Sequence, residues 1–374
     1  MYRLRLRWHV LLALSLIISC ISICNADETD EEFVMPVAPA HSEGKRISPD
    51  LHRADEVTKR VSSALDEGNV DALEKLADAL LKQQLPRPHG GSPQIGYLHL
   101  AMKIYLTLQQ PKEEDEITLH TFDRTLQTIH TWQQKYPRSG AAIVAEADVL
   151  LRRALAARGG DEIDKVTTGR LRVFEQSIAA AHRALTKNEE VGKTDPIWYD
   201  KMASAMWYGN ADRRDFIALI DAGMRAYPQN LDLADSGITY MLPRWGGSDK
   251  EVVAYIHHVL SNVTATDAPI VAARIYYHLL DAHYYEGLEL AYLLHLSPRE
   301  IEQAMEERAA RFPDPMNVDE EGVVACSLGD KRKLGELLAE IGESPIVVTW
   351  GYTGDGSYFS FCRNFMAFGA NHDR

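Results

Sequence analysis

The sequence contains few cysteines and lacks the short motifs that define common catalytic sites. Four cysteines occur among 374 residues, and none of them belongs to a Cys-x-x-Cys pair. This excludes a dense disulfide framework and the usual thiol-based zinc and redox motifs. Gly-x-Ser-x-Gly, a Walker phosphate loop and His-Glu-x-x-His are also missing. The sequence therefore contains no motif that dictates a catalytic activity.

Basic residues are also fewer than acidic ones, with 40 lysines and arginines against 54 aspartates and glutamates. The chain has a formal net charge of −14, although its first 26 residues hold three arginines and no acid. Without those three positive charges the rest of the chain carries −17. Such a surface repels phosphate backbones and anionic lipid headgroups. We therefore expect no nucleic-acid partner, whereas a neutral or basic protein partner is compatible with the charge.

The N-terminus has no hydrophobic run long enough to cross a bilayer comfortably. Three arginines precede an apolar run at residues 10–23, which has the length of a signal-peptide core. Small residues at Cys24 and Ala26 predict cleavage after Ala26, so residues 1–26 form a signal peptide. Lipidation of Cys20 and an uncleaved anchor are the alternatives. Each of the three places the body of the chain outside the cytoplasm, as a periplasmic or secreted protein or a membrane-anchored lipoprotein.

Cleavage after Ala26 leaves Cys326 and Cys362 as the cysteines of the mature chain. In an oxidising compartment such a pair predicts a disulfide, which contributes roughly 4 kcal/mol in the chain-entropy model. The alternative is two unrelated buried thiols, because a sequence gives no separation between Cα atoms.

Proline and glycine punctuate the chain three times in the same way. A helical stretch ends in an aromatic residue and proline, and the stretch that follows ends at glycine. Proline cannot continue a helix interior, and glycine is favoured just past a helix end. The pattern predicts an all-α fold of stacked antiparallel helix pairs, a degenerate tetratricopeptide-like solenoid. The aromatic–proline sites are Tyr136-Pro137, Tyr227-Pro228 and Phe312-Pro313, and the glycines are Gly159, Gly246 and Gly329.

The helix pairs do not recur at a fixed length. From Pro137 to Pro228 is 91 positions, and from Pro228 to Pro313 is 85. A regular tetratricopeptide array repeats about every 34 residues. The repeats are therefore degenerate, or further helix pairs lie between the recognisable ones.

The remaining chain divides into a leader, a hairpin, a repeat domain and a tail. Residues 27–50 are rich in proline, acids and small residues, which predicts a flexible leader. Residues 51–84 predict a helical hairpin, and the proline- and glycine-rich residues that follow it up to Pro93 predict a loop. Residues 95–345 predict one helical-repeat domain, in which serines such as Ser139, Ser248 and Ser297 cap helices. Residues 346–374 predict a C-terminal tail packed on the last helices, as a short strand or an extended segment.

The most specific local motif lies between two predicted helices. A helix leads into Met241-Leu242-Pro243-Arg244-Trp245-Gly246-Gly247-Ser248, and an earlier helix ends in Ala157-Arg158-Gly159-Gly160. These features resemble a bacterial family of proteins grouped as a domain of unknown function, over about residues 110–345. The resemblance implies a helical, tetratricopeptide-like fold and no established activity. No catalytic residue can be carried over from it.

Arg244 and Trp245 are the first candidates for a partner-binding site. Exposed in a groove, they would grip a partner peptide or its carboxylate. The structural alternative, which we favour, buries Trp245 between helix pairs and pairs Arg244 with an acid.

Aromatic residues supply a second candidate surface. Trp198 and Tyr208 lie ten positions apart, which places them on one helix face. Such a stripe is most often part of a core, and the alternative is a concave wall that faces a ligand.

Titratable residues cluster once, at His278, Asp281, His283 and Glu286. On a helix the two histidines point about 140° apart, so one metal ion could not easily bind both. The sequence therefore predicts no metal site and no cofactor.

These observations favour an exported helical-repeat protein that acts as a scaffold in the cell envelope and binds another protein or peptide. Helix-pair solenoids offer extended binding surfaces, which is the physical basis of that expectation. The alternative is an envelope enzyme whose catalytic residues are scattered over helices and escape detection by spacing. Contact with a membrane is expected only through a lipid anchor at Cys20.

Overall fold

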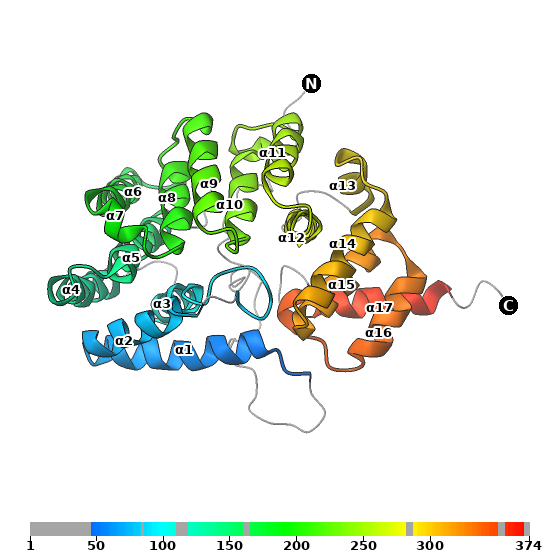
Figure 1. The fold of residues 1–374 in the computed structure, drawn as a ribbon, viewed down its shortest axis with the longest axis horizontal. Helices are drawn as coiled ribbons and strands as arrows, with labels where there is room; N and C mark the ends of the chain where they lie inside the picture. The colour runs from blue at the N-terminus through cyan, green and yellow to red at the C-terminus, as the bar shows by residue number, and fades with distance from the viewer. Residues whose placement is uncertain are drawn as a thin grey trace. The chain divides into compact units, whose positions relative to one another are not determined.

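The computed structural model describes residues 46–83, 86–109, 119–159, 165–281, 287–350 and 356–369. These residues form α-helices, short 3₁₀ turns and loops, and their only β-pairing is an isolated bridge between Pro86 and Pro93 (Figure 1). The predicted all-α class is confirmed. Within the described ranges, no helix has both the length and the apolar character that crossing a membrane requires.

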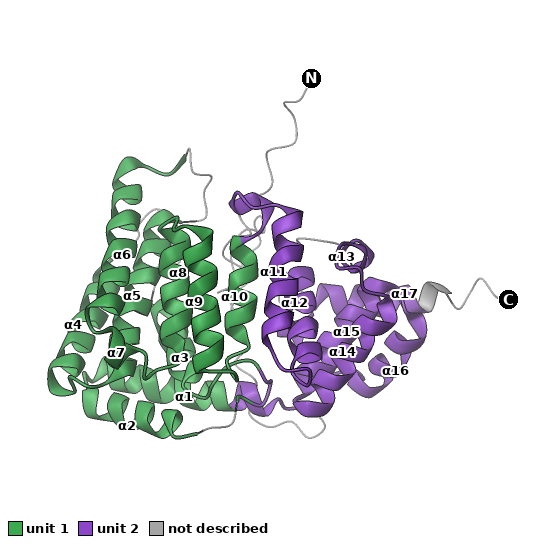
Figure 2. Ribbon diagram, turned by 45° about the horizontal axis from the view of Figure 1, so that its top comes forward, with its two compact units in different colours: residues 1–11, 53–87, 91–240 green, residues 12–52, 88–90, 241–374 purple. Residues whose placement is uncertain are grey.

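The chain divides into two compact units (Figure 2). Within the described ranges, unit 1 comprises residues 53–87 and 91–240, and unit 2 comprises residues 46–52, 88–90 and 241–369. The predicted repeat domain over 95–345 thus falls partly in unit 1 and partly in unit 2, and its being one domain stays a prediction. Each unit packs its own core around a different central helix.

Unit 1 contains most of α1 and the helices up to α10. They are α1 (Pro49–Asp66), α2 (Val70–Leu81), α3 (Gly96–Leu108), α4 (His120–Lys135), α5 (Gly140–Arg158), α6 (Thr168–Lys187), α7 (Glu189–Gly192), α8 (Ile197–Tyr208), α9 (Arg213–Ala226) and α10 (Asp232–Tyr240). Helix α5 is central, since it contacts α2, α3, α4, α6, α7 and α8.

Unit 2 begins with a 3₁₀ turn and continues as helices. They are η3 (Pro243–Trp245), α11 (Asp249–Asn262), α12 (Ala268–Asp281), α13 (Gly287–Leu293), α14 (Pro298–Arg311), α15 (Pro315–Leu328), α16 (Lys331–Ile341), η4 (Val347–Thr349) and α17 (Ser357–Gly369). Helix α15 is central here, since it contacts α12, α13, α14, α16, α17 and η4.

The three aromatic–proline sites end helices with one shared geometry. Tyr136, Tyr227 and Phe312 have φ of −125°, −135° and −126° and ψ of 70°, 74° and 83°. Each donates its backbone N–H to the carbonyl four residues earlier, at 2.8, 2.8 and 2.9 Å. The following proline excludes the α conformation at the residue before it. The predicted helix ends are therefore confirmed at α4, α9 and α14.

Each aromatic–proline corner marks the passage from a surface helix to a core helix. The helices before the corners bury 5 of 16, 3 of 14 and 4 of 14 residues. The helices after them bury 13 of 19 in α5, 7 of 9 in α10 and 10 of 14 in α15. The sequence pattern therefore locates the helices that are enclosed on most sides.

Side-chain caps start the helices where the sequence predicts them. Ser139, Ser248 and Ser297 accept the backbone N–H three residues on, and Ser297 forms a reciprocal capping box with Glu300. Such a cap satisfies one of the N–H groups that a helix start leaves unpaired. The predicted starts of α5, α11 and α14 are confirmed.

The end of the predicted leader, residues 46–50, belongs to the folded part of the chain. Residues 1–45, with the predicted signal peptide and Cys20, lie outside the described residues. Residues 46–50 are not a leader, because Ser48 and Asp50 are buried in unit 2 and Pro49 begins α1. Ser48 Oγ donates to Asp314 at 3.0 Å, which gives this short segment a fixed partner.

The C-terminal segment is helical rather than a strand or an extended tail. Residues 347–349 form a 3₁₀ turn and α17 follows, packed against α15 and α16. Trp350 is fully buried and stands edge to face with Phe359, at 4.9 Å between ring centroids. Gly322 of α15 leaves room for this indole, because a Cβ there would lie 2.8 Å from the Trp350 ring. The β-prone composition of 346–350 reflects this burial.

A substitution at Gly90 tests the packing of the third aromatic–proline corner, Phe312-Pro313. It has φ +83°, and a Cβ on it would lie 2.3 Å from the Phe312 ring. We expect Gly90→Ala to destabilise the protein by about 2–4 kcal/mol in urea unfolding, from backbone strain plus overpacking. The matched control is Gly329→Ala, since Gly329 has φ +73° and nothing within 4 Å of the added carbon. Gly329→Ala should lower the free energy of unfolding by about 1–2 kcal/mol. Equal losses of stability in the two variants would show that Phe312 does not pack on Gly90.

Candidate functional site

The Arg244–Trp245 motif forms a tight corner. Pro243, Arg244 and Trp245 make one 3₁₀ turn, and Gly246 follows in the left-handed region at φ 76°. The corner closes when the Ser248 N–H donates to the Met241 carbonyl at 3.1 Å. Arg244 and Trp245 are both half-buried. The geometry gives this motif a structural role, and its role in binding a partner stays a prediction.

Sterics explain why glycine occupies position 247. A Cβ on Gly247 would lie 2.0 Å from the Met241 carbonyl oxygen, so only glycine fits without a backbone shift.

Trp198 does not line a binding wall. Its side chain is 2% exposed, and its indole N–H donates to the Leu185 carbonyl at 3.2 Å. The Lys193 ammonium lies 4.8 Å from its ring centroid. The favoured interpretation of Trp198 as a core residue therefore agrees with the structure, and the alternative of Trp198 as a partner-binding residue is wrong, because the ring belongs to the core of unit 1.

Tyr208 is half-buried at the other end of α8. Its ring stacks on Trp207 at 4.8 Å and meets Phe174 edge to face at 6.2 Å. Tyr208 thus contacts aromatic neighbours of unit 1, and the structure does not combine it with Trp198 into one exposed surface.

Cys326 of α15 and Cys362 of α17 form a disulfide with 5.9 Å between their Cα atoms. Cys362 is fully buried. The bond attaches the last helix to the central helix of unit 2.

The predicted titratable cluster is only partly described. His283 and Glu286 lie outside the described residues, whereas His278 and Asp281 belong to α12. Burial, with the negative charge of Glu320, raises the pKa of Asp281 to about 7. Among the described residues, no group of three or more His, Cys, Asp or Glu side chains could hold a metal ion.

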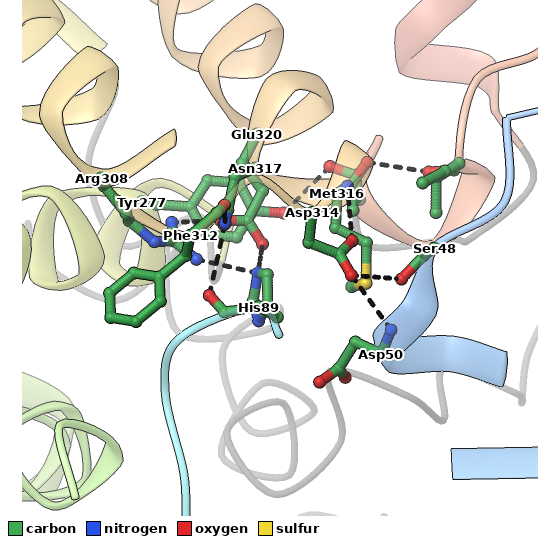
Figure 3. Close-up of polar contacts among 12 residues, drawn as sticks. Ser48, Asp50, His89, Tyr277, Arg308, Phe312, Asp314, Met316, Asn317 and Glu320 are labelled. Carbon is green, nitrogen blue, oxygen red and sulfur yellow. Dashed lines mark hydrogen bonds and ion pairs between the residues drawn. The ribbon is translucent and has the colours of Figure 1, made fainter. Parts of the chain in front are cut away.

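Unit 2 encloses a cluster of charged and polar side chains along α15, part of which Figure 3 shows. The Arg308 guanidinium forms an ion pair with Glu320, and both side chains are almost fully buried. His89 Nε2 lies 2.8 Å from Glu320 Oε1 and 2.8 Å from Arg308 Nη2. An isolated charge at this depth would cost several kcal/mol, so each group needs the others.

The pairing governs the ionisation of Glu320. Burial alone would raise the pKa of this carboxyl, but the charge of Arg308 and the contact with His89 outweigh it and lower the pKa to about 2. Tyr277 lies nearby and donates its hydroxyl to the Thr349 carbonyl at 2.9 Å. Burial, followed by the charges of Asp281 and Glu320, raises the pKa of Tyr277 well above its usual value.

Asp314 connects the starts of two helices. Its Oδ1 accepts the Met316 N–H of α15 at 2.9 Å, and its Oδ2 accepts the Asp50 N–H of α1 at 3.0 Å. The Ser48 hydroxyl donates to the same Oδ2. A carboxylate at a helix start also stabilises the positive end of the helix dipole. One side chain thus caps both α15 and α1.

Asp319 is the second connecting residue. Its Oδ1 accepts the Trp350 indole N–H at 2.6 Å and the Ile346 N–H at 2.9 Å, and its Oδ2 pairs with Arg46. Burial raises the pKa of Asp319, against the opposing effects of Trp350 and Arg46. Residues near both ends of the described chain therefore meet on one carboxylate.

A shallow depression of about 400 Å³ lies on the surface of unit 2, away from this cluster. It is predominantly apolar and is formed by α11 and the end of α13. Tyr292 of α13 is 82% exposed and borders it, and Leu288, one turn earlier, is 58% exposed. Its lining residues are Asp249, Lys250, Val253, Ala254, Tyr292, Leu293 and His295.

Comparisons of the chain with models of known families, with curated protein sequences and with solved structures found no match. The resemblance to the family with the Pro-Arg-Trp-Gly-Gly-Ser motif therefore stays a prediction.

The sequence did not reveal the buried cluster of α15. Asp319, Glu320 and Glu321 are consecutive acids, a run that normally indicates a solvated helix face. One signal could have located them: α15 follows the third aromatic–proline corner, and the helix after each corner is enclosed. The exposure of Tyr292 has no signature in the sequence.

Glu320 predicts a specific acid sensitivity. Its folded pKa of about 2 lies below the ordinary value of 4.5, so its stabilising effect is present above pH 4.5 and is lost as pH falls toward 2. We expect the free energy of unfolding of the wild type to fall on the order of 3 kcal/mol from this group over that interval. Glu320→Gln should be less stable at neutral pH and lose less on acidification, as measured by urea unfolding.

The control is Glu343→Gln, because Glu343 forms an exposed pair with Arg363 at 2.6 Å. This variant should keep the acid profile of the wild type. If Glu320→Gln also keeps that profile, the ion pair does not control the acid response.

Proposed function

We propose that this chain is an exported, degenerate tetratricopeptide-like helical-repeat protein that binds another protein or a peptide in the cell envelope. The repeated corner geometry of α4–α5, α9–α10 and α14–α15 supports the helix-pair part of this proposal. Proteins built from stacked helix pairs bind partners along their surfaces rather than in a deep catalytic pocket.

One observation carries the binding role: α13 holds large apolar side chains in water beside an apolar depression. Leu288 and Tyr292 lie four residues apart, so they share a face of α13. Contiguous apolar surface rimmed by polar groups marks interaction sites, and tyrosine is favoured as an anchor in interfaces. Lys250 and His295 provide polar groups at the border of the depression. A partner segment with an apolar side chain fits this surface.

The rigid support beneath α13 favours the same role. Gly287 begins the helix, and its carbonyl accepts the Tyr276 hydroxyl at 2.8 Å. A Cβ on Gly287 would lie 2.5 Å from the Ser327 carbonyl oxygen of α15, so the start of α13 lies directly on the central helix. A surface held in place in this way loses less conformational entropy when a partner binds.

Export is the second part of the proposal. The charged, apolar and small-residue order of residues 1–26 supports it, and so does the disulfide between Cys326 and Cys362, since such bonds persist in oxidising compartments. Lipidation of Cys20 would add a membrane anchor to the same protein.

An enzyme would need the groups whose pKa values are displaced to lie together at a pocket. Asp281 and Glu320 have displaced pKa values, yet neither lines the depression. No specific observation therefore favours the enzymatic alternative over binding.

The test is site-directed photo-crosslinking in the envelope of the native host. A photoreactive phenylalanine at position 292 should give a discrete adduct with one partner, because that side chain is exposed at the depression. Leu288→Asp in the same chain should weaken the adduct, since it places a charge on the apolar face.

The matched control places the same group at Phe361 of α17, which is 59% exposed. This position should give no adduct or a different one. No adduct at position 292, together with turnover of an envelope substrate by the purified protein, would contradict the binding role.

A further inference from the structure

Helix α13 ends in an unusual backbone conformation at the border of the apolar depression. The His295 N–H donates to the Tyr292 carbonyl at 3.1 Å, and the Leu296 N–H donates to the Ala291 carbonyl at 3.0 Å. This pair of bonds is typical of a helix end whose next residue is left-handed, and that residue is usually glycine. His295 occupies the position with φ +54°. The helix end therefore carries a ring where glycine would be expected.

Three other helices end with the same pair of backbone hydrogen bonds, and they use glycine or asparagine. Gly68 after α1, Asn210 after α8 and Gly329 after α15 have φ of 64°, 56° and 73°. Glycine has no Cβ, and asparagine tolerates this conformation, whereas it is unfavourable for a larger side chain. Strain of this kind often marks a residue that is used in function. His295 is therefore worth examining for a binding role.

His295 lines the depression together with Lys250 of α11, and both residues are exposed. The apolar part of the lining includes Val253 and Ala254 of α11 and Leu293 of α13. An imidazole donates at least one N–H in either protonation state, and an ammonium donates three. The depression thus offers an apolar surface with two hydrogen-bond donors at its border, one of them cationic.

An anionic group next to an apolar group is complementary to this lining. A carboxylate accepts stronger hydrogen bonds from an ammonium than a neutral acceptor does. The chain is acidic overall, with a formal net charge of −14, so it repels a strongly acidic segment. A single carboxylate at the end of a neutral or basic chain fits better. The depression, at about 400 Å³, has room for the end of a peptide.

Asp249 favours a peptide over a fatty acid as the source of that carboxylate. It lines the depression next to Lys250 in the sequence, and it also interacts within the protein. A carboxylate has about four lone-pair sites, so Asp249 can accept a further N–H from a ligand. The last residue of a peptide carries an amide N–H beside its carboxylate, whereas a fatty acid has no N–H.

We propose that the depression formed by α11 and α13 binds the C-terminus of a partner protein whose last residue is apolar. Lys250 and His295 bind the terminal carboxylate. The apolar side chain lies against Val253, Leu293 and Tyr292. Capture of a C-terminal carboxylate is an established mode of peptide recognition. The inference rests on the binding role proposed above and adds the chemistry of the partner.

The experiment measures binding of the full mature chain to an array of random hexapeptides, made once with free C-terminal carboxylates and once as C-terminal amides. The free acids that bind should share an apolar last residue. Fluorescence anisotropy of the best binders should show that their amides bind about tenfold more weakly. Decanoate at the concentration of the peptide should not displace them.

The outcomes separate this inference from the binding role itself. Equal binding of acids and amides would overturn carboxylate recognition and leave a peptide-binding surface. Displacement by decanoate would show a fatty-acid site instead. Binding of no hexapeptide would overturn the inference, and the adduct at position 292 tests the binding role independently.

Two variants test the assigned residues. Lys250→Met keeps the length of the side chain and removes its charge, so the acid and the amide should bind alike. His295→Gly removes the imidazole and relieves the left-handed strain. It should therefore bind the acids about tenfold more weakly, without a lower midpoint of thermal unfolding. Weak binding by this variant cannot then be ascribed to a loss of folding.

The matched controls are Lys331→Met and Asn210→Gly. Lys331 is an exposed lysine that begins α16, and Asn210 has the same left-handed conformation after α8. Neither residue lines the depression, so both variants should bind the peptides as the wild type does. A preserved preference for the acid in Lys250→Met, or wild-type affinity in His295→Gly, would overturn the carboxylate site.

Discussion

Unit 2 depends on the pairing of the acidic side chains that α15 buries. Asp319, Glu320 and Glu321 are consecutive and enclosed, and each meets a cation from a different part of the chain. Arg46 precedes α1, Arg308 lies in the last turn of α14, and Lys333 lies in the first turn of α16. A buried carboxylate without its cation is strongly destabilising, so these three pairs determine which segments pack on α15. Asp314 adds a further connection, because its carboxylate caps the starts of both α1 and α15.

The punctuation of the sequence was sufficient to predict the helical class, the three aromatic–proline helix ends and several caps. These features depend on local backbone chemistry, which a sequence states directly. The buried charges were missed because three adjacent acids look like a solvated face until their partners are known. Arg46 and Asp319 lie 273 positions apart, and no local pattern connects them. Two interpretations of Trp198 stayed open for a related reason, since an aromatic stripe looks the same in a core and on a surface.

The candidate binding surface on α13 depends on the same central helix, α15. The start of α13 lies against α15, and the exposed face of α13 then presents Leu288 and Tyr292 beside the depression. In unit 1, the residues after the second corner include Asn230, whose amide donates to the Asp200 carboxylate at 2.8 Å. Aromatic–proline corners thus do more than end helices. They place the polar side chains that follow them into the interior, where each needs a defined partner.

The central claim is that the Arg308–Glu320 pair matters as a pair rather than as two separate side chains. A double-mutant cycle of Arg308→Met and Glu320→Met in urea unfolding tests it most directly. Each single variant leaves a buried charge alone, so each should cost about 3–5 kcal/mol, whereas the double variant should cost far less than their sum. Additive losses, or a double variant less stable than either single one, would contradict the account.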